Sequence, residues 1–144
     1  MPATDLWPDF QAPEAINSPV FLLKEQAAKL QQKTKGLVLA GLRPASAPDG
    51  SFWVGFDLSS PALGEYTYRL FEVTYPPQFF PITLTSADGT ETAQSLGGFK
   101  GALESVLRSP RTKQIVEAIM AQATALGKAE TDDQEYYQPG SLRD

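Results

Sequence analysis

The sequence predicts an α+β fold in which an N-terminal helix, a four-stranded antiparallel meander and two C-terminal helices form one unit, with the C-terminal helices packed on the sheet. Apolar residues recur at helical spacing near both ends of the chain, and the middle instead carries strand-like segments. Turns rich in proline and glycine separate these segments. Because the connections are short, antiparallel neighbours are favoured over parallel strands.

Length and composition suit a single domain. The chain has 144 residues, of which 42% are apolar and 20% charged, so it is long enough to bury a core. We expect an extended arm over 1–17, one α+β domain over 18–127 and an acidic, mobile tail over 128–144. Trp7 and Phe10 are expected to hold the arm against the domain.

The first helix is predicted from Ser18-Pro19 to about Lys35. Serine is a favoured N-cap, and proline is tolerated at the first helical position because its missing N–H would have no partner there. Gly36 then suits the left-handed conformation that follows many helices. The apolar positions recur at helical spacing: Leu23, Ala27 and Leu30.

Four strand candidates follow, over 36–43, 51–58, 65–75 and 80–85. Pro44, Pro48 and Asp49-Gly50 separate the first two, and Asp88-Gly89 closes the last. In the second candidate, alternate residues are apolar, as in a strand with one buried face. The expected inward row is Phe52, Val54, Phe56 and Leu58.

Two helices are predicted after the strands. Ser109-Pro110 repeats the start signal of the first helix and begins the last one, which Gly127 is expected to end. The inward residues of the first of the two are Phe99, Leu103, Val106 and Leu107. Those of the last are Ile115, Ile119, Ala123 and Leu126.

Charge and missing residue types exclude several functions. The formal net charge of -5 opposes binding to phosphate backbones, so no nucleic acid partner is expected. The chain has no cysteine and no histidine, which excludes disulfides, thiolate or imidazole metal sites, cysteine nucleophiles and serine–histidine catalysis. We therefore expect no enzyme, metal or cofactor, although catalysis by carboxylates stays open.

No membrane segment is expected either. No apolar run approaches the roughly 18 residues of a spanning helix, and the first ten residues lack the features of a secretion signal. A cytoplasmic location is the resulting expectation.

The segment after the third strand candidate, residues 75–81, has the sequence YPPQFFP. Its prolines lack N–H donors, so the segment is a stiff loop that leaves the sheet. Phe80 continues the inward row of the next strand, and Phe79 is expected to face outward, although both rings packing under the loop remains an alternative. The predicted partner-binding residues are Tyr75, Pro76, Pro77 and Phe79.

This loop and the element order resemble the RWD and ubiquitin-conjugating-like superfamily. Members commonly carry a YPxxxP-like loop before the last strand of the meander, and Tyr75-Pro76 with Pro81 is similar to it, with one extra residue in the spacing. The resemblance covers residues 18–126 and implies this fold. Because catalytic members use a cysteine that this chain lacks, it implies the non-catalytic, protein-binding branch.

Three other residue groups have side chains that could form a site. Asp57 and Glu72 lie on adjacent predicted strands, where they could form a carboxylate pair, and Arg69 could pair with either. The segment SLGGFKGA, with Lys100, precedes a helix but lacks the P-loop pattern, and we interpret it as a flexible start to the helix. No calcium-loop spacing surrounds Asp88.

The sequence therefore predicts a non-enzymatic protein-binding domain. It is either an adaptor-like module or a small acidic inhibitor, such as an immunity or antitoxin-type protein that blocks a basic partner. The alternative is an enzyme or small-ligand binder that uses Asp57, Glu72 and Arg69 in a cleft.

Overall fold

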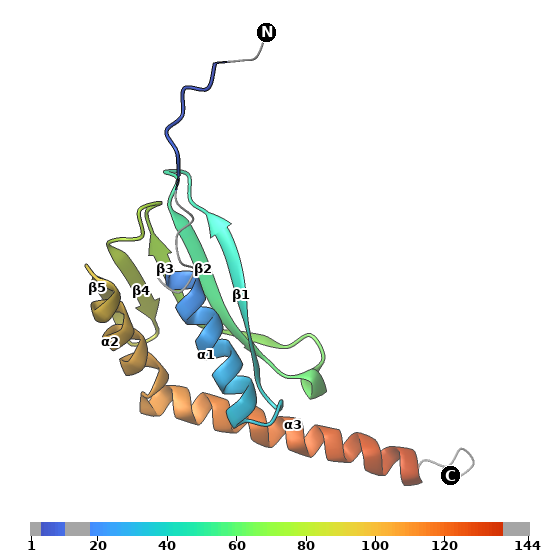
Figure 1. Cartoon of the computed structure of the whole chain (residues 1–144). Coiled ribbons are helices and arrows are strands. Elements are labelled where there is room, and N and C mark those ends of the chain that lie inside the picture. The colour runs from blue at the N-terminus through green and yellow to red at the C-terminus, as the bar shows by residue number, and fades with distance from the viewer. Residues whose placement is uncertain (1–3, 11–17, 137–144) are drawn as a thin grey trace.

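A computed structural model describes residues 4–10 and 18–136, and it confirms the α+β class with an antiparallel sheet (Figure 1). The elements in chain order are α1 (Pro19–Lys33), β1 (Leu39–Ser46), β2 (Phe52–Ser59), the 3-10 turn η2 (Pro61–Leu63), β3 (Thr67–Tyr75), β4 (Ile82–Ser86), β5 (Gly89–Ala93), α2 (Leu96–Leu107) and α3 (Pro110–Tyr136). The sheet order is β1-β2-β3-β4-β5, so every strand pairs with its neighbours in the chain.

The sheet has five strands, one more than predicted. Asp88-Gly89 does not close the meander but lies in the hairpin that joins β4 to β5, where Ser86 pairs with Gly89. Gly89 has φ 135°, which a residue with a side chain rarely adopts. The sequence of β5, GTETA, is polar and exposed except at Ala93, so it lacks the apolar alternation by which the other strands were predicted.

Pro44 was expected between the first two strands, but it lies inside β1. It pairs with Val54 of β2, and β1 runs from Leu39 to Ser46 instead of 36–43. Because β1 is an edge strand, a residue without an N–H donor can be accommodated on its open side.

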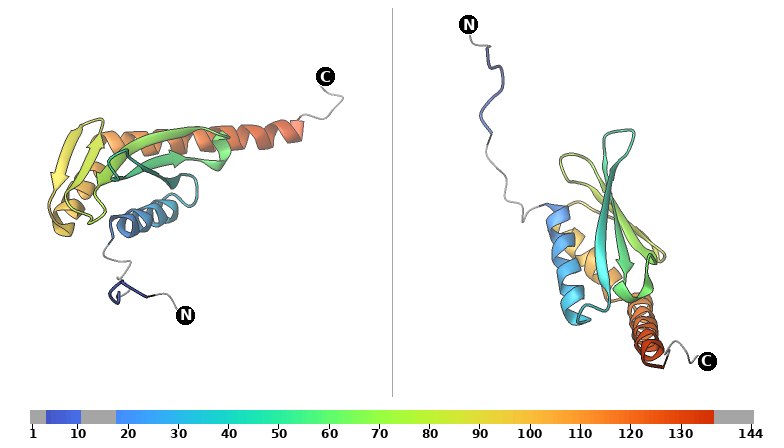
Figure 2. Two further views of the ribbon diagram at one scale, coloured as in Figure 1. Left: turned by 90° about the horizontal axis from the view of Figure 1, so that it is seen from above. Right: turned by 90° about the vertical axis from the view of Figure 1, so that its right-hand side faces the viewer.

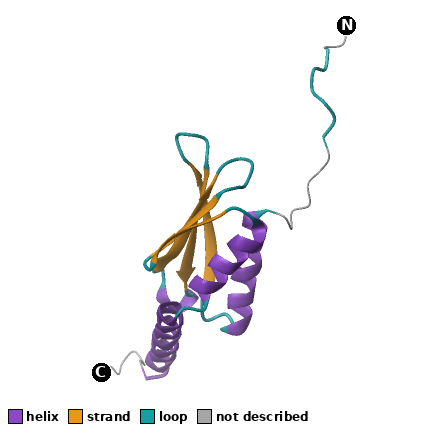
Figure 3. Cartoon of the chain, turned by 90° about the vertical axis from the view of Figure 1, so that its left-hand side faces the viewer, coloured by secondary structure: helices purple, strands orange, loops and turns teal. Residues whose placement is uncertain are grey.

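The helices α1 and α2 lie on the same face of the sheet, and α3 runs past the end of the strands (Figures 2 and 3). We call the face under α1 and α2 the inner face and the opposite one the outer face. No helix of the described chain covers the outer face of the sheet itself. The arrangement therefore leaves one face of the sheet without helical cover.

The hydrophobic core lies between the inner face and the two helices. Phe56 and Phe71 stack at its centre with their ring centroids 4.7 Å apart, and each is 1% exposed. Residues of the helices and of the other strands complete it, among them Leu23, Val38, Val54, Leu58, Val73, Ile82, Leu84, Phe99 and Leu103. The predicted inward row of β2 is confirmed except for Phe52, which is half-exposed at the start of the strand.

The start of α1 is as predicted. The Ser18 side chain accepts a hydrogen bond from the Phe21 N–H at 3.1 Å, and Pro19 is the first helical residue. The helix ends at Lys33, where the buried Thr34 side chain bonds to the Leu30 carbonyl at 2.9 Å and accepts from the Val38 N–H at 3.1 Å. These two bonds connect the helix end directly to the approach to β1.

The two C-terminal helices depart from the prediction at their ends. Ser95 caps α2 by accepting from the Gly98 N–H at 3.1 Å, so the glycines of SLGGFKGA lie within the first turns of the helix and not in a flexible lead. The expectation that Gly127 ends the last helix was wrong, because α3 continues through it to Tyr136. The remaining part of the predicted tail, 137–144, lies outside the described residues.

The described part of the N-terminal arm does not pack on the domain, contrary to expectation. Residues 4–10 have no regular secondary structure and extend away from the sheet (Figure 1). Trp7 and Phe10 contact each other, with ring centroids 6.0 Å apart, and remain 75% and 74% exposed. Leu6 is 88% exposed. The arm therefore presents three large apolar side chains that the domain does not bury.

Candidate functional site

The predicted loop lies at the end of the sheet where β3 ends, β4 begins and β2 starts. Tyr75, the last residue of β3, is in register with Phe52, the first residue of β2. The Phe79 N–H donates to the Pro76 carbonyl at 2.8 Å, which closes a turn, and the Phe80–Pro81 peptide is cis. We call the surface formed by Phe52 and residues 75–80 the aromatic ledge.

Tyr75 is the buried residue on which the aromatic ledge packs. It is 3% exposed and stacks on Phe52, with ring centroids 5.6 Å apart and an interplanar angle of 27°. Phe79 meets the Tyr75 ring edge-on at 6.1 Å. Burial raises the pKa of Tyr75 above its usual value. A partner would therefore reach the residues around Tyr75 and not its ring.

The expectation that Phe79 faces outward while Phe80 packs inward was wrong, and the alternative, in which both rings pack under the loop, fits the structure. Both side chains are half-buried, both pack against the core, and their rings meet edge-on with centroids 6.5 Å apart. The prediction assumed an extended chain, in which neighbours point to opposite faces. Phe79 instead has φ 82°, an uncommon and costly conformation for a bulky residue, so strand alternation does not hold through the loop.

Phe52 belongs to the aromatic ledge although the sequence placed it in the core. It is 46% exposed, while the next three residues of its row are buried. The first residue of a strand can extend beyond the helices that cover the sheet, and only Ser51 separates Phe52 from the Asp49-Gly50 turn. That position next to a turn was the signal available in the sequence.

A second candidate group of polar side chains lies on the outer face, across β1, β2 and β3. Asp57 of β2, whose side chain is 10% exposed, accepts hydrogen bonds from two arginines. The Arg69 guanidinium binds both carboxylate oxygens, through Nε to Oδ1 and through Nη2 to Oδ2 at 3.2 Å. Arg43 Nε binds Oδ2 at 3.2 Å. We call Arg43, Trp53, Asp57 and Arg69 the arginine cluster.

Two further features fix the position of Arg69. Its guanidinium carbon lies 4.7 Å from the centroid of the Trp53 ring, which is a cation–π distance. The guanidinium also passes directly over Gly55, where an added Cβ would lie only 2.6 Å from Arg69 Nε. Gly55 is therefore needed for the close approach of the side chain to the backbone.

The predicted pair of carboxylates does not form. Glu72 is in register with Gly55, and Asp57 is in register with Arg69 after a bulge in β3. The hydrogen bond from Arg69 holds the pKa of Asp57 below its ordinary value, opposed by burial and supported by Arg43. Asp57 is thus an ionised anchor for two guanidinium groups, and Glu72 makes no ion pair among the residues that the structure describes.

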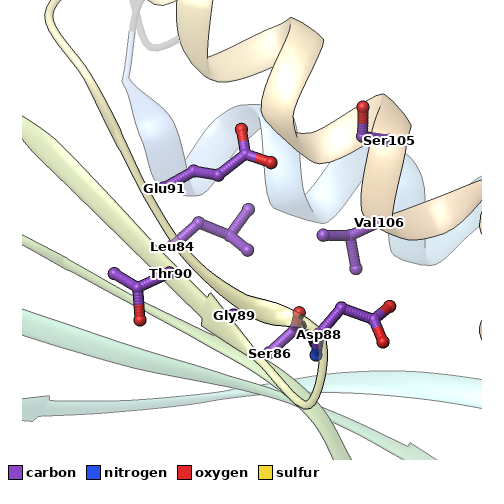
Figure 4. Close-up of a pocket in the computed structure, with 8 residues that line it drawn as sticks. All are labelled: Leu84, Ser86, Asp88, Gly89, Thr90, Glu91, Ser105 and Val106. Carbon is purple, nitrogen blue, oxygen red and sulfur yellow. Dashed lines mark hydrogen bonds between the residues drawn. The ribbon is translucent and has the colours of Figure 1, made fainter.

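A shallow pocket of about 280 Å³ lies between the β4–β5 hairpin and α2 (Figure 4). Leu84 and Val106 form its apolar part, and Asp88 and Glu91 supply carboxylates. Over residues 4–10 and 18–136 no group of three or more acidic side chains is placed to hold a metal ion. The pocket therefore has an acidic rim without the ligand set of a cation site.

Lys100 and Ser109 do not form a site: one lies at the surface and the other caps a helix. Lys100 is exposed and lies within α2. A nucleotide site would need it at the end of a phosphate-binding loop. The Ser109 side chain caps α3 by accepting from the Thr112 N–H at 3.1 Å.

The structure thus defines a class: an α+β domain with a meander sheet, covered by helices on one face and open on the other. The chain matches no family model. Comparison with curated proteins gives no match. Comparison with solved structures gives no match either. Within the described ranges, none of the helices has the length and apolar character needed to cross a membrane.

Proposed function

We propose that this protein is a non-enzymatic protein-binding domain and that the aromatic ledge is its contact surface. One observation carries the proposal: Phe52 is 46% exposed yet stacked on a buried tyrosine. An aromatic ring that is partly exposed and already held in place is the side chain that interface anchors favour.

The surroundings of Phe52 lower the cost of binding. Pro76 and Pro77 restrict the backbone of the loop, and the hydrogen bond from the Phe79 N–H to the Pro76 carbonyl closes it. Binding of a partner therefore has few backbone torsions of the loop left to order. Pro76 is half-buried and Pro77 is exposed, so apolar proline surface follows directly after Tyr75, the residue on which Phe52 stacks. These residues supply a stiff apolar surface and no group with catalytic chemistry.

The kind of partner follows from the charge. A net charge of -5 favours a basic protein, as in the small acidic inhibitors of the immunity type, whereas an adaptor would bind mainly through the apolar ledge. The order of one helix, a meander and two helices supports the proposed likeness to the non-catalytic RWD and ubiquitin-conjugating-like domains. We place the protein in the cytoplasm as part of the same proposal.

The alternative of an enzyme or ligand site at Asp57, Glu72 and Arg69 is less well supported. A general base needs a carboxylate that can take up a proton, and Asp57 already accepts bonds from two guanidinium groups. The geometry of these residues supports recognition rather than turnover.

The test uses two aromatic residues of equal exposure. Phe52 and Tyr66 are both 46% exposed, but Tyr66 lies just before β3, away from the aromatic ledge. The purified chain and its Phe52→Ala and Tyr66→Ala variants are used as bait, and bound proteins are quantified by mass spectrometry. We expect Phe52→Ala to weaken capture of a specific partner about fivefold or more, and Tyr66→Ala to leave it unchanged.

Salt separates the two kinds of partner. Capture that falls steeply with ionic strength indicates a basic partner, and capture that tolerates salt indicates an apolar adaptor surface. Equal loss of a partner in both variants, with unchanged melting temperatures, would show that the ledge is not the contact surface.

A further inference from the structure

The arginine cluster lies on the open outer face and keeps unused hydrogen-bond donors. A guanidinium group has five N–H donors; Arg69 commits two nitrogens to Asp57 and Arg43 commits one. Arg43 is 66% exposed and Arg69 is 38% exposed, so the remaining donors are accessible. Arg43 Nε and Arg69 Nη2 each lie 3.2 Å from the same carboxylate oxygen, which makes the two groups neighbours.

This arrangement suits a second anion. Asp57 supplies one negative charge against two arginines, and the Glu72 carboxylate also acts electrostatically on Arg69. The cluster therefore attracts a further carboxylate through its free N–H donors and not through an excess of charge. Planar guanidinium groups held in place bind carboxylates with little loss of side-chain freedom. Trp53, half-exposed beside Arg69, adds an aromatic surface next to the free donors.

The N-terminal arm has the complementary chemistry. Residues 5–10 read DLWPDF, with two carboxylates and no basic residue. Asp5 Oδ1 accepts from the Trp7 N–H at 3.0 Å, which gives the segment a local turn. Leu6, Trp7 and Phe10 are between 74% and 88% exposed, so the segment buries none of its large apolar side chains on its own domain.

We propose that the segment Asp5–Phe10 of one copy binds the arginine cluster of a second copy. Its carboxylates meet the free donors of Arg43 and Arg69, and its aromatic rings pack on the outer face beside Trp53. The arm and the cluster are distinct surfaces of one chain, so two copies can exchange arms reciprocally in a closed two-fold dimer. Two such contacts strengthen each other because the second forms within an already joined pair.

The first experiment measures self-association. Sedimentation velocity of the full chain over a range of concentrations is expected to show a monomer–dimer equilibrium that weakens with salt. Trp7→Ala/Phe10→Ala in the arm and Arg43→Glu in the cluster should each weaken dimerisation about tenfold or more. Arg108→Glu, the same charge change at the exposed C-cap of α2, is the matched control and should have no effect.

Mixing the variants distinguishes exchange between copies from docking within one copy. A copy with a defective arm retains its cluster, and a copy with Arg43→Glu retains its arm, so the mixture should form a heterodimer through the one intact contact. A mixture that stays monomeric overturns exchange between copies, as does a wild-type chain that is monomeric throughout.

A peptide probe tests the contact directly. A fluorescein-labelled peptide of residues 4–10 is titrated into the full chain carrying Trp7→Ala/Phe10→Ala, with fluorescence anisotropy as the readout. Binding that weakens about tenfold for a peptide with Asp5→Asn/Asp9→Asn, and that Arg43→Gln also weakens, supports the proposal. Absence of binding, or binding that ignores both changes, overturns it. Melting temperatures of every variant confirm that the domain remains folded.

Discussion

The inner and outer faces of the same sheet are stabilised in different ways. The inner face is apolar and covered by α1 and α2, with Phe56 and Phe71 stacked at its centre. The outer face carries the arginine cluster over β1–β3 and threonine pairs over β4 and β5. Burial is non-directional and tolerates substitutions that conserve volume, whereas the cluster depends on hydrogen-bond geometry around one carboxylate.

The difference shows which positions are replaceable. On the inner face an apolar side chain of similar size and shape retains most of the burial energy. On the outer face even one methyl group at Gly55 meets Arg69, although Gly55 is not part of the hydrophobic core. Three substitutions test this comparison, from the largest expected effect to the smallest.

Truncation on the inner face should have the largest effect. Phe71→Ala removes a ring that is 1% exposed, and we expect a loss of about 3–5 kcal/mol in the free energy of unfolding, measured by urea denaturation. Its control is the neighbouring Glu72→Ala on the outer face, which should cost less than about 1 kcal/mol. Comparable losses for the two variants would contradict the distinction between the faces.

Gly55→Ala should have an intermediate effect on the outer face. Alanine is normally favoured over glycine in a strand by about 0.5–1 kcal/mol, but here the new Cβ displaces the Arg69 guanidinium from Asp57. We expect a net loss of about 1–3 kcal/mol by urea denaturation, as for other buried groups that lose a partner. Gly41→Ala on β1 is the matched control, because nothing lies within 4 Å of its added Cβ. Stabilisation by both changes would show that Arg69 moves without cost.

The smallest effect concerns pH. Arg69, with support from Arg43, holds the folded-state pKa of Asp57 below the ordinary value of 3.8. The resulting stability is therefore fully present above pH 3.8 and is lost as pH falls through the folded-state value. Urea denaturation of the wild type and Asp57→Asn should show a difference that is constant near neutrality and shrinks below pH 3.8. A difference that does not change with pH would mean that the carboxylate charge contributes nothing.

The structure confirms most of the predicted fold. The errors in the prediction share a cause. The first helix and four of the strands were recognised because Pro19, Gly36 and the alternating apolar rows are local signals. β5 was missed because its sequence is polar, and it is a strand only because β4 offers an unpaired edge. Gly127 was taken as a helix end, yet it lies within α3, 4.0 Å from the Ala62 side chain of η2 when given a Cβ.

The sequence predicted where the candidate site lies but not all of the residues that form it. The proline-rich loop was identified from its own residues, since proline conformation does not depend on distant contacts. The contribution of Phe52 was not, because its exposure depends on which distant residues the fold places over it. Asp57 and Arg69 were recognised as neighbours, but their bond depends on the bulge in β3 that puts Arg69 opposite Asp57 and leaves Glu72 opposite Gly55.

The amino-acid order alone determined the fold class, the helix starts at Ser18 and Ser109, and the stiff loop after Tyr75, because caps, prolines and apolar periods act over a few residues. Tertiary structure decided the fifth strand, the exposure of Phe52 and the arginine cluster on the outer face. Each of these depends on residues far apart in the chain, and a one-residue shift in strand register would place Arg69 on the other face, away from Asp57.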